Sequence, residues 1–143
     1  MIVPNKSSYG TLVILVLSLL FLPAGGSSGN EADLHAEIET LYREMELEGS
    51  FDMDVFTLAV VGYANLRDSG QLKKPTPLSI IDYTKPSTDK RMVIVDIIGR
   101  RLLYNSLTAH GKNTGANYAV SFSNEHGTRM SSLGFFATGE TYY

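Results

Sequence analysis

The residues best suited to chemistry lie together between residues 109 and 136, where histidine, asparagine, serine and glycine are set between two apolar runs. The stretch holds two histidine-glycine pairs, His110-Gly111 and His126-Gly127. Histidine changes its charge near neutral pH, which suits it to proton transfer and to metal binding. Polar segments of this kind are typical of binding loops carried on a rigid scaffold. This stretch is therefore the first candidate for a functional site.

Neither a serine hydrolase nor a zinc site is favoured by the spacing of these residues. The available serines are Ser121, Ser123, Ser131 and Ser132, and none stands in a Gly-x-Ser-x-Gly elbow. The two histidines are sixteen residues apart and belong to no His-Glu-x-x-His motif, and the chain has no cysteine to complete a zinc site. A phosphate-binding glycine loop is also absent. The sequence therefore predicts no metal and no cofactor.

Two carboxylates, Asp82 and Asp96, lie in neighbouring strand-like segments and could in principle serve as general acid and base. Ordinary strand residues surround both of them, and nothing in the pattern places the two side chains in one cleft. We therefore expect salt bridges rather than catalysis. The expected partners are Lys90, Arg91 and Arg100.

The charges divide the chain into an acidic part and a mildly basic part. Residues 27–69 contain ten acidic and two basic residues, whereas residues 70–143 contain five acidic and nine basic residues. This distribution suggests two structural units that face each other, or a basic face turned toward an anionic partner. The basic excess is too small, and too free of interleaved aromatic residues, to indicate nucleic-acid binding.

The first 28 residues have the composition of a secretory signal peptide. Lys6 gives a small positive start, residues 12–22 form an apolar run broken by Ser18, and small residues follow Pro23. Eleven residues are too few to span a bilayer, which needs roughly 20. We therefore expect an exported protein, periplasmic or extracellular, with no stable membrane anchor after cleavage. Without cysteine it has neither a lipid-modified N-terminus nor a disulfide.

Residues 29–70 predict a helical segment. Asn30 suits the cap of a first helix that ends near Gly49. Its apolar residues recur at helical spacing, as Leu34, Ile38, Leu41 and Met45, and its glutamates lie mostly off that stripe on a solvated face. A second helix is expected from Asp54 to Arg67. It is apolar on nearly all sides and is therefore buried, with Tyr63 in the core.

Residues 71–143 predict strands after a short stiff linker at residues 73–77. The expected strands are 78–83, 92–98, 102–109 and 130–138, with a shorter one at 118–122. The second is apolar except for Asp96, so we expect it in the middle of a sheet with both faces covered. Gly99-Arg100 predicts a turn that makes a hairpin with the third. The fold class is therefore α+β, with a mainly antiparallel sheet.

From about residue 55 to residue 143, several motifs occur in an order that is specific to one family. The matching segments are residues 81–91, 93–105, 109–115, 121–124, 131–135 and 138–143. In these segments the chain resembles the front half of the murein L,D-transpeptidase catalytic domain family, of YkuD-like fold. The resemblance implies an incomplete sheet of that type over residues 71–143.

The resemblance also implies a chemistry. Such enzymes remodel peptidoglycan through a cysteine thiolate, which attacks a stem-peptide carbonyl and leaves a thioester that an amine resolves. In the family, the catalytic histidine and the Ser-x-Gly-Cys element follow the Glu140-Thr141-Tyr142-Tyr143 stretch. The chain contains no cysteine. We therefore expect no catalytic residue here, and His110 is not a replacement for the missing base.

Three functions remain open. The first is a truncated member of the family, inactive in acyl transfer. The second is a noncatalytic exported protein that binds peptidoglycan stem peptides. The third is an interaction protein that docks through the acidic helices of residues 31–67. The candidate substrate-binding residues are His110, Gly111, Asn113, Gly115, Ser123, Asn124, Ser131, Ser132 and Gly134.

Overall fold

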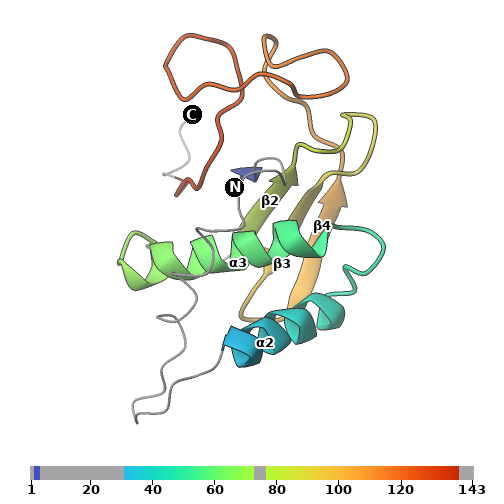
Figure 1. The fold of residues 1–143 in the computed structure, drawn as a ribbon, viewed down its shortest axis with the longest axis vertical. Coiled ribbons are helices and arrows are strands. Elements are labelled where there is room, and N and C mark those ends of the chain that lie inside the picture. Colours follow the sequence, from blue (N-terminus) through green and yellow to red (C-terminus); the bar gives the residue numbers. More distant parts are fainter. Residues whose placement is uncertain (1, 4–30, 73–76, 139–143) are drawn as a thin grey trace.

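The computed structural model describes residues 2–3, 31–72 and 77–138. Two helices, α2 (Glu31–Glu44) and α3 (Met53–Asp68), precede three antiparallel strands, β2 (Leu78–Asp82), β3 (Met92–Asp96) and β4 (Arg101–Ser106). A two-residue strand, β1 (Ile2–Val3), adds to β2 in parallel, so the sheet order is β1-β2-β3-β4. The helices lie across one face of the sheet, and residues 107–138 form a long loop beyond the strand ends (Figure 1). This arrangement confirms the α+β class.

Helix α2 is held to the core by the predicted apolar stripe, because Leu34, Ile38, Leu41 and Met45 are all buried. The helix ends at Glu44, earlier than the expected stop at Gly49. The chain then reverses through two residues with positive φ, Glu46 and Gly49. The predicted cap, Asn30, lies outside the described residues.

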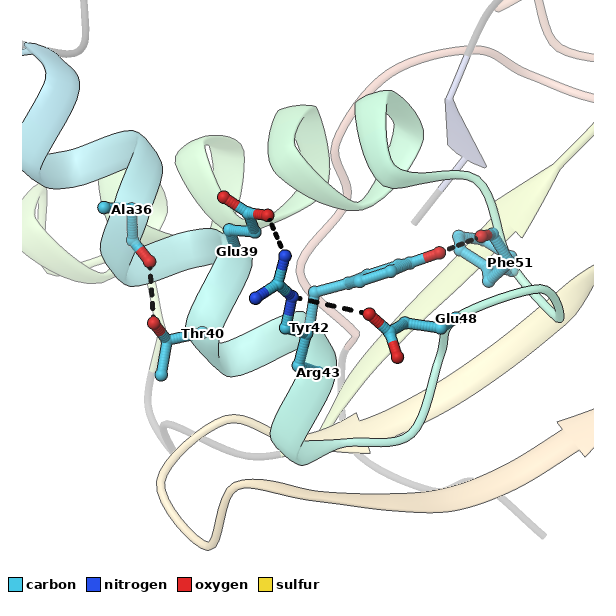
Figure 2. Close-up of polar contacts among 7 residues, drawn as sticks. All are labelled: Ala36, Glu39, Thr40, Tyr42, Arg43, Glu48 and Phe51. Atoms are coloured by element: carbon cyan, nitrogen blue, oxygen red, sulfur yellow. Dashed lines mark hydrogen bonds and ion pairs between the residues drawn. The ribbon is translucent and has the colours of Figure 1, made fainter.

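The exposed side of α2 carries local ion pairs and one contact that fixes the following turn (Figure 2). Arg43 joins Glu39 and Glu48, and Thr40 Oγ1 donates to the Ala36 carbonyl. On the buried side, the Tyr42 hydroxyl donates to the Phe51 carbonyl. Burial is the main cause that raises the pKa of Tyr42, with Asp52 and Glu48 adding to it. The tyrosine therefore stays neutral and connects α2 to the start of α3.

Helix α3 is buried on most sides, as its sequence predicts. Asp52 caps it, because its carboxylate accepts hydrogen bonds from the amides of Asp54 and Val55 at 3.0 and 3.1 Å. Its buried residues are Val55, Phe56, Ala59, Val60, Val61, Gly62, Tyr63 and Ala64. Tyr63 is buried among them, which confirms that this residue belongs to the core, and the burial raises its pKa.

Strand β3 occupies the predicted central position, but one of its faces lacks full cover. Val93 and Val95 point into the core beneath the helices, whereas Met92 and Ile94 on the other face are only half-buried. The prediction of two covered faces was therefore wrong. The cause is that both helices pack on the same side of the sheet (Figure 1).

The hairpin between β3 and β4 is confirmed, and it contains an irregularity. Ile94 pairs with Tyr104 and Val95 pairs with Leu102, so Leu103 is an extra residue in β4. Such a bulge bends and twists the strand at the open edge of a sheet, which opposes pairing with another chain. The hairpin turn includes Arg100, whose φ is +50°.

The strands expected at residues 118–122 and 130–138 are not formed. Phe122 and Ser131 make an isolated bridge, Gly134 is a further bridge position, and the other described residues of this region form an irregular loop. Near its far end, Phe135 lies against Gly62 in α3 instead of joining the sheet. Phe135, a residue of the expected strand, therefore docks the loop on a helix.

Most of the predicted signal peptide and most of the linker lie outside the described residues, at 4–30 and 73–76. Residues 2 and 3 form β1, with Ile2 beside Ile81 and Val3 beside Asp82. The signal peptide thus stays a prediction. Within the described parts of the chain, no helix has the length and apolar character needed to cross a membrane.

Candidate functional site

Arg91, which immediately precedes β3, is the centre of the candidate site although it is fully buried. Its Nε and Nη2 donate to the Thr108 carbonyl at 3.1 and 2.8 Å, and its Nη1 donates to the Lys85 carbonyl at 3.0 Å. The guanidinium also lies 5.0 Å from the centre of the Tyr83 ring, within cation–π range. Arg91 therefore fixes the start of the long loop to the segment that follows β2.

The fourth contact of Arg91 determines the state of His110. Nη2 lies 2.9 Å from His110 Nδ1, and His110 Nε2 lies 3.1 Å from the Gly115 carbonyl. A guanidinium only donates and a carbonyl only accepts. Nδ1 must therefore be the acceptor, and the ring hydrogen is on Nε2. Because both nitrogens are occupied, His110 is a neutral structural imidazole and has no free position for base catalysis.

Asp82 supplies the negative charge nearest to this cluster. It is 1% exposed and lies opposite Arg91 in the sheet, since its amide donates to the Arg91 carbonyl at 2.8 Å. Its Oδ1 accepts from the amide and hydroxyl of Thr84 at 2.9 and 2.6 Å. Its Oδ2 is buried without a hydrogen-bond partner. Burial lowers the pKa of Arg91, while Tyr83 and Asp82 act in the opposite direction, so the carboxylate compensates the buried cation.

Asp82 and Asp96 do not form an acid–base pair. They terminate antiparallel strands and therefore lie at opposite ends of the sheet, roughly 17 Å apart along the strands for five residues. The expected salt bridges also need correction. Asp96 pairs with Arg101 at 3.3 Å, and Asp82 makes no ion pair among the described residues, since its hydrogen bonds go to Thr84.

A second layer of contacts joins the two ends of the loop around Thr114, which is fully buried. Its hydroxyl accepts from the Ser131 amide at 2.7 Å, and its carbonyl accepts from the amides of Val120 and Ser121. Ser131 Oγ in turn accepts from the Gly111 amide at 2.9 Å, with the Tyr83 hydroxyl at 3.4 Å. These bonds give the loop a fixed shape without regular strands.

Two glycines in this layer are required by close packing. A Cβ at Gly111 would lie 2.6 Å from the Arg129 carbonyl oxygen, and one at Gly115 would lie 2.1 Å from the Tyr118 carbonyl oxygen. Gly115 also has a φ of +153°, which a residue with a side chain rarely adopts. Both positions therefore need glycine.

The remaining candidate residues form a separate group at the outer part of the loop. Asn124 exchanges two hydrogen bonds with the backbone of Leu133, at 3.0 and 3.1 Å. Ser132 Oγ donates to the Ser123 carbonyl, and Ser123 Oγ accepts from the Glu125 amide. Asn113 Nδ2 donates to the Thr128 carbonyl, which connects this group to the first. Their side chains bind the loop to itself.

The structure thus places the predicted residues in one loop, in two groups. His110, Gly111, Gly115 and Ser131 surround Arg91 and Thr114, whereas Ser123, Asn124 and Ser132 lie farther out. Gly134 lies at the end of the second group with a φ of +124°. Sequence reasoning missed Arg91 and Thr114 as the residues that organise the loop. The one available signal was the position of Arg91 directly before an apolar strand.

Two other features of the described residues bear on function. No group of three histidine, aspartate or glutamate side chains is placed to hold a metal ion within residues 2–3, 31–72 and 77–138. A hollow of about 290 Å³ lies between α2, α3 and the β3–β4 turn. Its walls include Ile38, Val60 and Ile97, with Arg67 and Arg100 at its border. It lies at the end of the sheet away from the loop, so it is separate from the candidate site.

Comparison with known proteins identifies the family. The model of the L,D-transpeptidase catalytic domain matches residues 47–143, which is more than half of the chain. The match begins somewhat before the resemblance described above and includes α3, the strands β2, β3 and β4, and the whole loop. Neither the curated proteins nor the solved structures contain a match. The chain therefore belongs to the L,D-transpeptidase catalytic domain family.

Proposed function

We propose that the protein is an exported, cell-wall-associated member of this family whose residues 1–143 do not catalyse acyl transfer. The observation that carries the proposal is the absence of cysteine from these residues. The family chemistry needs a thiolate to form the covalent acyl intermediate. Serine could substitute only with a base beside it, and the two ring nitrogens of His110, the histidine grouped with Ser131, are bound to Arg91 and Gly115.

A mass measurement tests the proposal directly. The purified protein is incubated with a muropeptide that carries a tetrapeptide stem, and its intact mass is recorded over time. We expect no change in mass, whereas a cysteine-containing member of the family, treated in parallel, gains the mass of the acyl group. An adduct on the present chain would overturn the proposed inactivity.

A second candidate function, binding of peptidoglycan stem peptides without catalysis, is supported by the order in the loop. Hydrogen bonds among the loop's own residues hold it in one shape. Ligand binding would therefore not be weakened by the loss of conformational entropy that ordering a loop requires. The loop also presents Tyr118, which is 55% exposed, and Val120, which is 74% exposed. Exposed aromatic side chains on a rigid loop are suitable binding contacts.

Sedimentation with purified sacculi tests this second function. We expect the protein to sediment with sacculi and Tyr118→Ala to reduce the bound fraction several-fold, because the loop loses its exposed ring. Tyr104→Ala is the matched control, since Tyr104 is 66% exposed but lies on β4. Equal recovery of the wild-type protein with and without sacculi would exclude binding. Equal losses in both variants would exclude the loop as the binding surface.

A further inference from the structure

We propose that protonation of His110 frees the part of the loop that is held around Gly115 and Thr114, so that this part is fixed near neutral pH and opens in acid. The proposal concerns a conformational change and is independent of the proposed function. It follows from the geometry around one ring, since the imidazole of His110 links Arg91 to Gly115 only in its neutral form.

Adding a proton to His110 removes the acceptor that Arg91 uses. The proton must go to Nδ1, because Nε2 already carries the hydrogen that is donated to the Gly115 carbonyl. Nδ1–H would then face the Nη2–H group of Arg91 at a distance of 2.9 Å. Two donors and two positive charges would be opposed beside a guanidinium that is fully buried. The bond cannot survive this change.

The other groups around the ring do not compensate the added charge. Tyr83, from the segment after β2, meets the imidazole edge to face at 6.4 Å between ring centres. Asp82, on β2, directs its Oδ1 to Thr84, and its Oδ2 has no partner. Lys85 adds positive charge nearby, although its ammonium donates to the Ser50 carbonyl. The protonated ring therefore gains no hydrogen-bonded counterion in this arrangement.

Loss of this bond would weaken other hydrogen bonds of the loop, because Gly115 and Gly111 lie next to the residues that form them. The Gly115 carbonyl and the Gly111 amide lie on either side of Thr114, whose hydroxyl and carbonyl hold Ser131, Val120 and Ser121. The Gly111 amide itself donates to Ser131 Oγ. Release at His110 thus removes support from the contacts that join both ends of the loop. The contacts of α2 and α3 with the strands involve none of these residues.

Hydrogen exchange followed by NMR tests the proposal, with amide rates corrected for their intrinsic pH dependence. We expect the protection factors of Val120 and Ser121 to fall at least tenfold between pH 7.5 and pH 5, while those of Val93 and Val95 in β3 stay within twofold. His110→Gln keeps a neutral side chain and should abolish the fall. His126→Gln is the matched control, because His126 is exposed in the same loop and should leave the fall unchanged.

Three results would overturn the proposal. The first is unchanged loop protection in acid in the wild-type protein, and the second is a fall that persists in His110→Gln. The third is an equal loss in β3, which would show global unfolding. A separate measurement on the wild-type protein does not depend on the folding of any variant. Nitrogen chemical shifts of the His110 ring at pH 7.5 should show hydrogen on Nε2 alone, and hydrogen on Nδ1 would contradict the proposal.

Discussion

Replacing Arg91 with methionine should lower the free energy of unfolding by about 3–6 kcal/mol, since two carbonyls each lose a charged donor, at about 1.5–3 kcal/mol apiece. Methionine keeps an apolar stem, but it leaves the Thr108 and Lys85 carbonyls without their donor and Asp82 without a compensating cation. Urea unfolding followed by circular dichroism measures the change. Arg91→Lys should recover only part of the loss, because one ammonium cannot reproduce the planar set of donors.

An exposed arginine provides the control for this substitution. Arg100 pairs with Glu44 at 2.8 Å, and both side chains are about half exposed. Arg100→Met should therefore change the free energy of unfolding by less than about 1 kcal/mol. If Arg91→Met costs no more than Arg100→Met, the buried cluster does not stabilise the fold. Combining Arg91→Met with Asp82→Asn should cost less than the sum of the two changes, since the second removes the uncompensated carboxylate.

The second large effect is expected at Gly115. Gly115→Ala should destabilise the protein by about 3 kcal/mol, because the new Cβ would lie 2.1 Å from the Tyr118 carbonyl oxygen and φ is +153°. The backbone must move, and it would take with it the carbonyl that His110 binds. Thermal unfolding measures the cost, and NMR shifts of residues 110–131 locate the displacement.

A second glycine of the same loop separates the two causes. Gly127 also has a positive φ, +86°, but a Cβ there would meet nothing within 4 Å. Gly127→Ala should therefore show backbone strain alone, about 1 kcal/mol. Similar costs for the two substitutions would mean that packing against Tyr118 contributes little. A larger cost at Gly115 would measure the steric part of the effect.

The helices could be predicted from the sequence because the spacing of apolar residues within each segment is sufficient to identify a helix and its buried side. The stripe from Leu34 to Met45 matches the buried side of α2, and the almost wholly apolar run after Asp54 matches the buried helix α3. Asp52 and Asp54 marked the start of α3 correctly to within one residue. Local periodicity determines such elements, so no knowledge of the partner surfaces was needed.

The sheet and the loop depend on partners that the sequence does not specify. Met92 and Ile94 are as apolar as Val93 and Val95, and only the placement of both helices on one side distinguishes the two faces. The same limit explains the missing strand at residues 130–138. Its apolar residues suit a strand, but the space beside Gly62 in α3 accepts the ring of Phe135.

The sequence predicted which residues belong to the candidate site, but not the contacts that hold them together. His110, Gly111 and Ser131 were selected from one stretch of sequence, and the structure joins them by hydrogen bonds. Arg91 was expected only as a salt-bridge partner of Asp82 or Asp96. Its burial depends on carbonyl groups seventeen residues later and six residues earlier. No local sequence pattern shows that these two carbonyl groups will take their hydrogen bonds from Arg91.

The docking of Phe135 on Gly62 has a consequence for how the loop behaves when it is cut. Arg91 holds the first part of the loop at Thr108 and His110, and Phe135 holds the last part on α3. Between them, the bonds from Thr114 and Gly111 to Ser131 cross from one side of the loop to the other. A protease that cleaves at the exposed tip around Glu125, His126 and Gly127 would therefore leave two fragments that remain associated. The nicked chain would migrate as a single species until denaturant separates its pieces.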